Sequence, residues 1–244
     1  MTSEIRPTLS AAPAADLAQA TVDQRRIDTF ERLLSLFPAG RLVDLGAGHG
    51  KLAIRAARMG WQVTAVDART ERFPDTKAAD FRQADVRTVD LNGYDLILCL
   101  GLFYHLTLDD QRSLLARSAG TPIMIDTHVA VGESHYAASL GELVTVDGLE
   151  GRWFGESTLP TASWGNELAF WPTPDSLGRM LRNVGYGVVL ESDPWVMSDR
   201  RFYLALPAGY TSPAMGVRGA TKAWVHALRF RASARWRAAR TAQV

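Results

Sequence analysis

The stretch Arg41-Leu-Val-Asp-Leu-Gly-Ala-Gly-His-Gly-Lys-Leu-Ala-Ile54 decides the fold of this chain of 244 residues. Leu42, Val43 and Leu45 form a short apolar run, which is typical of a parallel strand covered on both faces. Three glycines follow at alternate positions, and they allow backbone angles and a close ligand approach that a Cβ atom would block. The stretch therefore predicts a strand, a glycine-rich turn and the start of a helix, with a ligand over the turn.

The chemistry of this turn differs from that of a dinucleotide site. Dinucleotide-binding folds seat a pyrophosphate on a helix N-terminus with the pattern G-x-G-x-x-G. Here Lys51 stands in place of the third glycine, and Asp44 precedes the turn, where it would repel a pyrophosphate. The turn therefore favours a cationic ligand, and a nicotinamide-dependent oxidoreductase is the disfavoured alternative.

Three further segments follow the turn in a fixed order: Trp61-Gln-Val-Thr-Ala-Val-Asp-Ala68, Phe81-Arg-Gln-Ala-Asp-Val86 and Tyr94-Asp-Leu-Ile-Leu-Cys-Leu-Gly-Leu-Phe-Tyr-His-Leu106. Together with Val43-Asp-Leu-Gly-Ala-Gly-His-Gly50 they resemble the motifs of the class I S-adenosylmethionine-dependent methyltransferases, whose donor carries a sulfonium and an ammonium group. The resemblance covers residues 41–106 and implies S-adenosylmethionine as the cofactor. It implies little about the methyl acceptor.

The resemblance gives roles to three carboxylates. Asp44 faces the cationic donor, Asp67 accepts both ribose hydroxyls, and Asp85 meets the adenine amino group. A non-catalytic protein derived from a decayed enzyme is an alternative, but such a protein would be expected to lose some of these acids. The residues implied in the donor site are Asp44, Gly46, Ala47, Gly48, Gly50, Asp67, Ala68, Asp85, Val86, Leu100 and Gly101.

Composition limits the size and the class of the protein. With 47% apolar residues and a formal charge of +1, the chain suffices for one α/β domain with a modest insertion. Its single cysteine, Cys99, excludes a disulfide framework and indicates a reducing compartment. We find neither an export signal nor the ~20 consecutive apolar residues of a membrane span. We therefore expect a cytoplasmic protein.

The alternation of strands and helices predicts the fold class. Strand-like runs cover 41–45, 62–67, 81–84, 95–100 and 122–126, with helical segments over 50–59 and 109–117. This alternation is typical of a doubly wound α/β fold. After a helix over 173–185, the runs over 186–190 and 201–206 are joined too briefly for a helical crossover, so they should be antiparallel. We predict a mostly parallel, seven-stranded, Rossmann-like methyltransferase sheet that ends in an antiparallel hairpin.

We expect a flexible N-terminus over 1–20, a methyltransferase domain over 21–210 with a lid insertion at about 130–171, and a basic helical tail over 211–244. An amphipathic helix should begin near Thr21 and stop at Pro38. On this helix we interpret Arg25 and Arg26 as part of a solvated face. The donor's carboxylate is their alternative partner.

Two histidines follow strands at the sheet edge where open α/β folds place their ligands. His105 comes after the fourth strand and His128 after the fifth. An acceptor hydroxyl gains from proton removal, so both are candidate catalytic bases, with His105 preferred. A structural role for each imidazole stays open. We expect no metal at Asp126 and His128, because no matching acid follows the fourth strand.

The insertion over 130–171 is unusually rich in aromatic residues. Long segments at the ligand edge of a sheet tend to be lids, and aromatic faces suit planar rings, sugars or onium groups. The alternative is that half of these rings form the lid's own core. The proposed substrate contacts, which include two residues after the fourth strand, are Phe103, Tyr104, Trp153, Trp164 and Trp171.

The tail has no acid, and Trp224, Leu228, Ala232 and Trp236 repeat every four residues along it. This pattern predicts a basic amphipathic helix that contacts an anionic surface, RNA or a partner subunit. The alternative is a terminal helix packed on its own domain. The basic residues of the tail are Arg218, Lys222, Arg229, Arg231, Arg235, Arg237 and Arg240.

The sequence favours methyl transfer to an oxygen or nitrogen of a small or medium-sized molecule of aromatic, sugar or natural-product type. The main alternative is an RNA-modifying enzyme of the same fold. The basic tail supports it, and Leu102-Phe-Tyr-His-Leu106 resembles a segment of the tRNA wobble-uridine carboxymethyl-transfer enzymes. The near-neutral overall charge disfavours it. Neither the acceptor nor the oligomeric state follows from the sequence.

Overall fold

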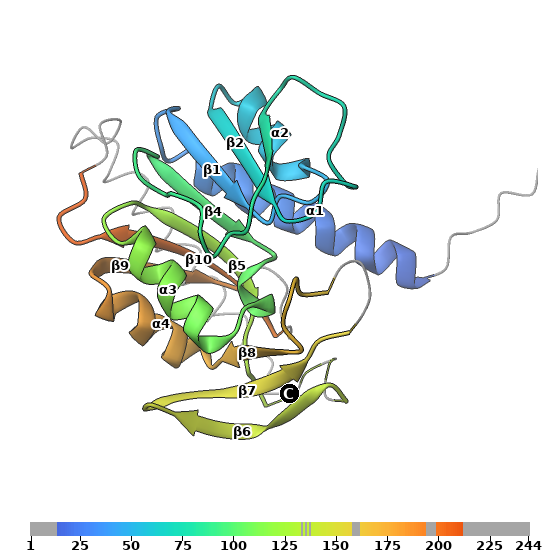
Figure 1. Ribbon diagram of the computed structural model, residues 1–244, viewed down its shortest axis with the longest axis vertical. Helices are drawn as coiled ribbons and strands as arrows, with labels where there is room; N and C mark the ends of the chain where they lie inside the picture. Colours follow the sequence, from blue (N-terminus) through green and yellow to red (C-terminus); the bar gives the residue numbers. More distant parts are fainter. Residues whose placement is uncertain are drawn as a thin grey trace, which may run out of the picture.

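A computed structural model gives the architecture of the chain (Figure 1). It describes residues 14–132, 134, 136, 138–157, 162–193 and 199–211, and only the backbone of residues 14–23. The first thirteen residues and the predicted basic helix after Thr211 lie outside the described residues.

The main sheet has seven strands in the order β3-β2-β1-β4-β5-β10-β9. Neighbouring pairs among β1 to β5 are parallel, and β10 runs antiparallel to both β5 and β9. The predicted mostly parallel sheet with an antiparallel end is therefore confirmed. The bounds are β1 Arg41–Leu45, β2 Gln62–Asp67, β3 Asp80–Gln83, β4 Leu96–Leu100, β5 Ile123–His128, β9 Tyr186–Ser192 and β10 Arg200–Pro207.

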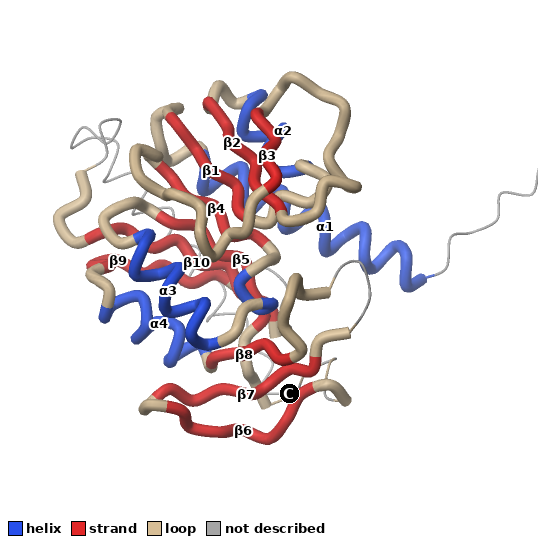
Figure 2. Tube along the Cα trace, in the orientation of Figure 1, coloured by secondary structure: helices blue, strands red, loops and turns tan. Residues whose placement is uncertain are grey.

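Helices cover both faces of this sheet (Figure 2). On one face, α1 (Ala14–Leu34) and α2 (Lys51–Arg58) pack on side chains such as Leu96 and Met124. On the other face, α3 (Leu108–Ser118) and α4 (Pro174–Asn183) pack on neighbours such as Ile97 and Ile125. Alternate residues of the central strands therefore enter two separate cores, which explains their continuous apolar runs.

Local signals in the sequence set the helix boundaries. The Thr107 and Thr173 hydroxyls accept hydrogen bonds from the amides of Asp110 and Ser176, so each threonine caps the N-terminus of its helix. Helix α1 begins at Ala14, before the predicted start near Thr21, so part of the predicted flexible N-terminus is helical. Its first turns consist mainly of alanine and lack the periodic large apolar residues that predict an amphipathic helix.

The insertion between β5 and α4 folds into a second sheet, seen at the bottom of Figure 1. Its strands are β6 (Leu140–Val146), β7 (Leu149–Gly155) and β8 (Leu168–Pro172), in antiparallel order β6-β7-β8. The Phe170 amide donates to the Leu106 carbonyl at 3.1 Å, which joins β8 to the loop after β4. The insertion is therefore a small sheet fixed beside the ligand edge rather than a simple loop.

Cys99 lies fully buried in the middle of β4. Burial raises the pKa of its thiol well above the usual range, and the nearby Asp44 and Asp126 add to that effect. The thiolate form is therefore negligible in the folded state.

In the part of the chain that the structure describes, none of the helices combines the length and apolar character needed to cross a bilayer.

Candidate active site

The glycine turn after β1 leaves room for a ligand. Gly48 has a φ of 51°, and a Cβ added there would meet no atom within 4 Å. Gly50, with a φ of 66°, packs so tightly that a Cβ would lie 2.4 Å from the Phe81 ring. The amides of Gly46 and Ala47 donate to the Val66 carbonyl at 2.8 and 3.0 Å, which joins the turn to β2. The turn is therefore packed against the protein at Gly50 and open at Gly48.

Asp44 is a buried carboxylate with a raised pKa. It is only 3% exposed at the end of β1, and burial raises its pKa to about 7, although the charge of Arg26 opposes this shift. The charge of Asp67 raises the pKa further. A buried carboxylate of this kind ionises readily when a cation approaches it, so the site fits a positively charged ligand.

Asp67 and Asp85 lie at the ends of the neighbouring strands β2 and β3. Asp67 accepts hydrogen bonds from the amides of Gly48 and Arg69, both at 2.9 Å. Asp85 accepts from the Arg87 amide at 2.9 Å and from the Arg87 Nε at 2.9 and 3.0 Å. The bond to the Arg87 side chain, opposed by partial burial, lowers the pKa of Asp85. A ligand amino group at Asp85 would share the carboxylate with Arg87.

The flanking candidates of the donor site lie at the same edge. The Ala68 carbonyl accepts from the Gln83 amide group at 3.1 Å, and the Val86 carbonyl accepts from Arg117 at 2.8 Å. The Leu100 carbonyl accepts from Arg26 at 2.8 Å. Gly101 has a φ of 90°, and a Cβ there would lie 2.9 Å from the Arg26 guanidinium. The structure therefore brings the ends of β1, β2, β3 and β4 to one edge of the sheet, where Arg26 of α1 contacts the end of β4.

Asp126 lies fully buried between two arginines. Arg26 of α1 contacts its Oδ2, and Arg200 of β10 donates to Oδ1 at 2.6 Å and to Oδ2 at 2.8 Å. Burial would raise the pKa of Asp126, but the two guanidinium groups outweigh that effect and lower it. The interpretation of Arg26 as part of a solvated face is therefore wrong. Arg26 instead joins α1 to the sheet ends.

Each candidate base forms a pair with a carboxylate. The His105 Nδ1 lies 2.8 Å from Glu156 Oε1, and the His128 Nδ1 lies 2.8 Å from Asp199 Oδ1. Because a carboxylate can only accept, Nδ1 carries the proton in both rings and Nε2 is left as the basic atom. Within the described ranges, neither Nε2 has a hydrogen-bond partner.

His128 lies within a cluster of rings from the loop after β4 and from the insertion. It stacks on Trp171 at 4.8 Å and 13°, and Phe154 stacks near Trp171 at 4.7 Å and 14°. Tyr104 and Tyr136 meet His128 edge-on at 4.6 and 5.0 Å. We call Tyr104, His128, Tyr136, Phe154 and Trp171 the ring cluster. Tyr136 is 43% exposed and presents this cluster to solvent.

The predicted substrate contacts lie in different environments. Phe103 is fully buried in the core, and Trp171 is buried in the ring cluster, with its indole N–H donating to the Tyr104 carbonyl at 3.0 Å. Trp153 packs on Phe170 beside the core. Trp164 is 53% exposed and stacks with Arg69 near the donor acids. Of the five, only Tyr104 both touches His128 and belongs to the loop after β4.

Sequence reasoning missed several site residues. The carboxylate partners of the two histidines, Glu156 and Asp199, do not follow from the sequence. Asp199 precedes β10, 71 residues after His128, so only the antiparallel pairing of β10 with β5 brings the two together. Among the described residues, no group of three or more His, Cys, Asp or Glu side chains is arranged to hold a metal ion.

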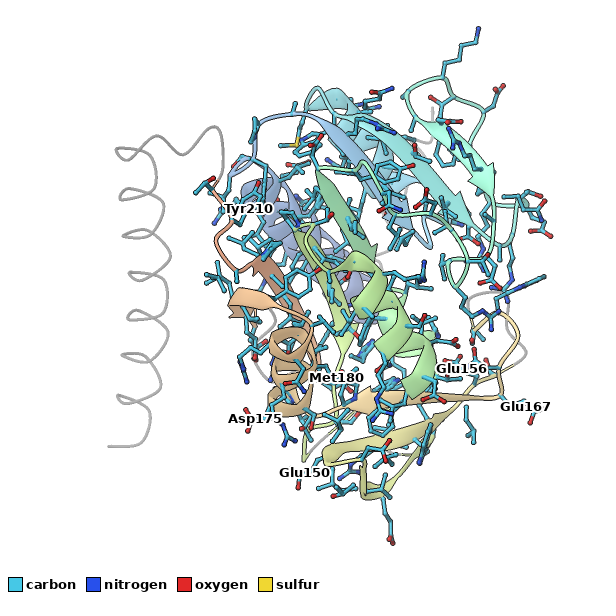
Figure 3. The ribbon with its side chains drawn as sticks, turned by 60° about the vertical axis from the view of Figure 1, so that its left-hand side comes forward. Glu150, Glu156, Glu167, Asp175, Met180 and Tyr210 are labelled. Carbon is cyan, nitrogen blue, oxygen red and sulfur yellow. The ribbon has the colours of Figure 1, made fainter. Side chains whose placement is uncertain are left out.

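A surface hollow of about 350 Å³ lies at the opposite edge of the sheet, at the amino ends of β1, β4 and β5. Its lining includes Trp61, Asp95 and Tyr210. Tyr210 and the insertion residue Glu156 lie far apart in Figure 3. The hollow is therefore not part of the candidate active site.

Residues 42–120 match a protein-family model described as a methyltransferase domain. No curated protein sequence matches the chain significantly. The N-terminal domain of EvdMO1, crystallised with S-adenosylhomocysteine and D-fucose, is 25% identical over 75% of this chain and 82% of its own, with a TM-score of 0.59.

Two other solved structures share the fold at lower identity. A Burkholderia thailandensis 1,6-didemethyltoxoflavin-N1-methyltransferase is 18% identical over 82% of this chain and 91% of its own, with a TM-score of 0.52. The glycopeptide N-methyltransferase MtfA, complexed with S-adenosylmethionine, is 18% identical over 82% of this chain and 99% of its own, with a TM-score of 0.53.

These findings agree with the open glycine turn, the buried Asp44 and the strand order, and they support S-adenosylmethionine rather than a nicotinamide dinucleotide as the cofactor. Residues 42–120 therefore form a methyltransferase domain, and the chain is an S-adenosylmethionine-dependent methyltransferase.

Proposed function

We propose that this enzyme methylates an oxygen or nitrogen of a small or medium-sized molecule of aromatic, sugar or natural-product type. The observation that carries the proposal is the His128–Asp199 pair at the end of β5, faced by Tyr104 and the exposed Tyr136. The solved relatives add support, since EvdMO1 was crystallised with D-fucose and the other two are named for 1,6-didemethyltoxoflavin and a glycopeptide.

In the proposed donor site, three carboxylates and the glycine turn do the binding. Asp44 faces the cationic groups, Asp67 accepts the ribose hydroxyls, and Asp85 accepts from the adenine amino group. The turn residues Gly46, Ala47, Gly48 and Gly50 allow the close approach, and Ala68, Val86, Leu100 and Gly101 line the site. S-adenosylmethionine supplies a methyl group on a sulfonium, which leaves to a nucleophile aligned opposite it.

We propose His128 as the general base and keep His105 as the second candidate, which reverses the preference drawn from the sequence. Burial lowers the pKa of His128, and the nearby Arg200 adds to this, while the bond to Asp199 raises it. The imidazole is thus neutral at pH 7 and can accept a proton at Nε2. His105, in contrast, is tied to the insertion through its ring and through its carbonyl.

We expect His128→Ala to lower kcat about 10²-fold to 10⁴-fold, with His105→Ala as the matched control that changes kcat less. A base must be neutral, so wild-type kcat at saturating donor should fall only below about pH 6.5. Asp199→Asn keeps an acceptor oxygen but removes the negative charge that raises the pKa of His128, so the acid limb of the kcat profile should move to lower pH. A large loss in His105→Ala with normal turnover in His128→Ala would reverse the assignment.

Asp67→Ala should weaken S-adenosylhomocysteine binding by roughly 10-fold to 100-fold, because charge-assisted bonds of about 1.5–3 kcal/mol would be lost. The same change removes the acceptor of the Gly48 and Arg69 amides. Asp67→Asn, which keeps one acceptor oxygen, is the milder comparison. Calorimetry would measure both, and an unchanged dissociation constant in both variants would refute the ribose assignment.

The acceptor can be identified by incubating the protein with methyl-labelled donor and cell extract. We expect label in small molecules, and much less of it in the same extract with Asp67→Ala, which should bind the donor more weakly. A parallel reaction with total tRNA tests the RNA-modifying alternative. Label in tRNA alone would overturn the proposal and direct attention to the basic tail.

A further inference from the structure

Two arginines follow the proposed donor carboxylates in the same local turn. The Arg69 amide donates to Asp67 Oδ1, and the Arg87 amide donates to Asp85 Oδ1, both at 2.9 Å. We call these the two Asp-x-Arg turns. Strands β2 and β3 are parallel neighbours, with Asp67 paired to Gln83, so the turns lie side by side at the ligand edge.

Both arginine side chains reach the same part of the insertion, residues 162–166, which we call the cover segment. Arg69 donates to the carbonyls of Ala162 and Ser163 at 3.0 and 3.2 Å, and its guanidinium lies 5.3 Å from the centre of the Trp164 ring. Arg87 donates to the Trp164 carbonyl at 3.3 Å while its Nε binds Asp85. Two guanidinium groups therefore hold three consecutive carbonyls.

The other side of the cover segment is bound to a candidate base. The Ser163 hydroxyl and the Asn166 amide group donate to the His105 carbonyl at 2.9 and 3.2 Å. The Ser163 amide donates to Glu156 Oε2 at 2.9 Å, and Glu156 Oε1 binds the His105 ring. The cover segment thus connects the two donor acids with the His105–Glu156 pair.

We propose that Arg69 and Arg87 are positioning residues that close the cover segment when the donor occupies Asp67 and Asp85. The proposal rests on the proposed placement of the donor. A nucleoside that binds both acids fixes both Asp-x-Arg turns, so the guanidinium groups meet their carbonyls with less loss of conformational freedom. Donor binding therefore stabilises the part of the site that contains the His105–Glu156 pair.

Amide hydrogen exchange with S-adenosylhomocysteine as the probe tests this coupling without any acceptor. In the wild type we expect the ligand to slow exchange over residues 162–167 by about tenfold or more. In Arg69→Ala and in Arg87→Ala we expect the slowing to drop below about threefold, and the dissociation constant for the ligand should rise by the factor that the slowing loses, about threefold to tenfold, because closing and binding are linked. Arg69→Lys, which keeps one charged donor, should lie in between.

Arg82→Ala is the matched control, because Arg82 lies on β3 but pairs with Asp80 on the protein surface. In Arg82→Ala, the ligand should slow exchange over residues 162–167 as much as in the wild type. Amide exchange in α3 should be equal in all variants, which would show that they are folded. Ligand binding without slowing in the wild type, or full slowing in both alanine variants, would overturn the coupling alone. A variant that no longer binds the ligand would show that its arginine holds the donor itself. Failure of the wild type to bind would overturn the donor site as well.

Discussion

Asp44→Asn should abolish measurable S-adenosylhomocysteine binding at pH 8 and yet stabilise the ligand-free protein. The carboxylate is buried, and its pKa is raised to about 7 from an ordinary value of 3.8. The folded state therefore holds the proton more tightly than the unfolded state does, so stability falls as the pH rises from 3.8 towards 7. Above pH 7 the full cost applies, about 4 kcal/mol at most. An amide in the same place escapes this cost but offers no charge to a cation.

Urea denaturation at pH 5 and pH 8 measures the effect on the free energy of unfolding. The advantage of Asp44→Asn should be about 1–4 kcal/mol at pH 8 and smaller at pH 5. In the wild type, donor affinity should fall up to about tenfold per pH unit below 7, because binding requires the ionised carboxylate. Asp95→Asn, at the opposite edge of the sheet, should bind the ligand as the wild type does. Retained binding by Asp44→Asn would contradict the assigned role.

Asp126→Ala should destabilise the fold by about 3–5 kcal/mol. It would leave Arg26 and Arg200 facing each other at the sheet ends without their shared carboxylate. Because the pKa of Asp126 is lowered in the folded state, its contribution is present above pH 3.8 and is lost as the pH falls through the folded value. The difference in the free energy of unfolding between Asp126→Ala and the wild type should therefore become smaller in strong acid.

Chemical denaturation of Asp126→Ala and Asp126→Asn would measure this loss, with Asp126→Asn keeping the size of the side chain but not the charge. A second variant that combines Asp126→Ala with Arg26→Met should recover part of the stability, since one of the two unpaired charges is removed. An Asp126→Ala protein as stable as the wild type would mean that the pair of arginines tolerates mutual contact.

The central sheet could be predicted from the sequence because its strands are buried on both faces. Residues 96–100 and 123–125 are apolar runs that are buried throughout, so the sequence predicts these strands clearly. The insertion was predicted only as a lid, because β6 is mostly exposed and alternates poorly. The sheet of the insertion depends on the pairing of β6 with β7. It also depends on the glycine at position 151, because a Cβ there would lie 2.3 Å from the Phe170 ring.

The site could be predicted in part. The three acids followed from motifs, but the partners of the histidines did not, because Glu156 and Asp199 lie 51 and 71 residues from the bases that they bind. Trp171 was proposed as a substrate contact because of its size and place, yet His128 and Phe154 stack with it and bury it. The sequence did contain one indication of the two Asp-x-Arg turns, because Arg69 follows Asp67 by two residues and Arg87 follows Asp85 by two residues.

The single thiol of the chain offers a direct reading of these stability changes. Cys99 is enclosed in the middle strand of the sheet, and its raised pKa keeps it protonated in the native protein. An alkylating reagent should therefore modify it only during global opening, and the labelling rate would report the equilibrium population of the open form. Because Cys99 does not react in the native protein, a second cysteine placed at Trp164 would accept a fluorophore selectively. The fluorophore would then follow the motion of the cover segment in the same molecule.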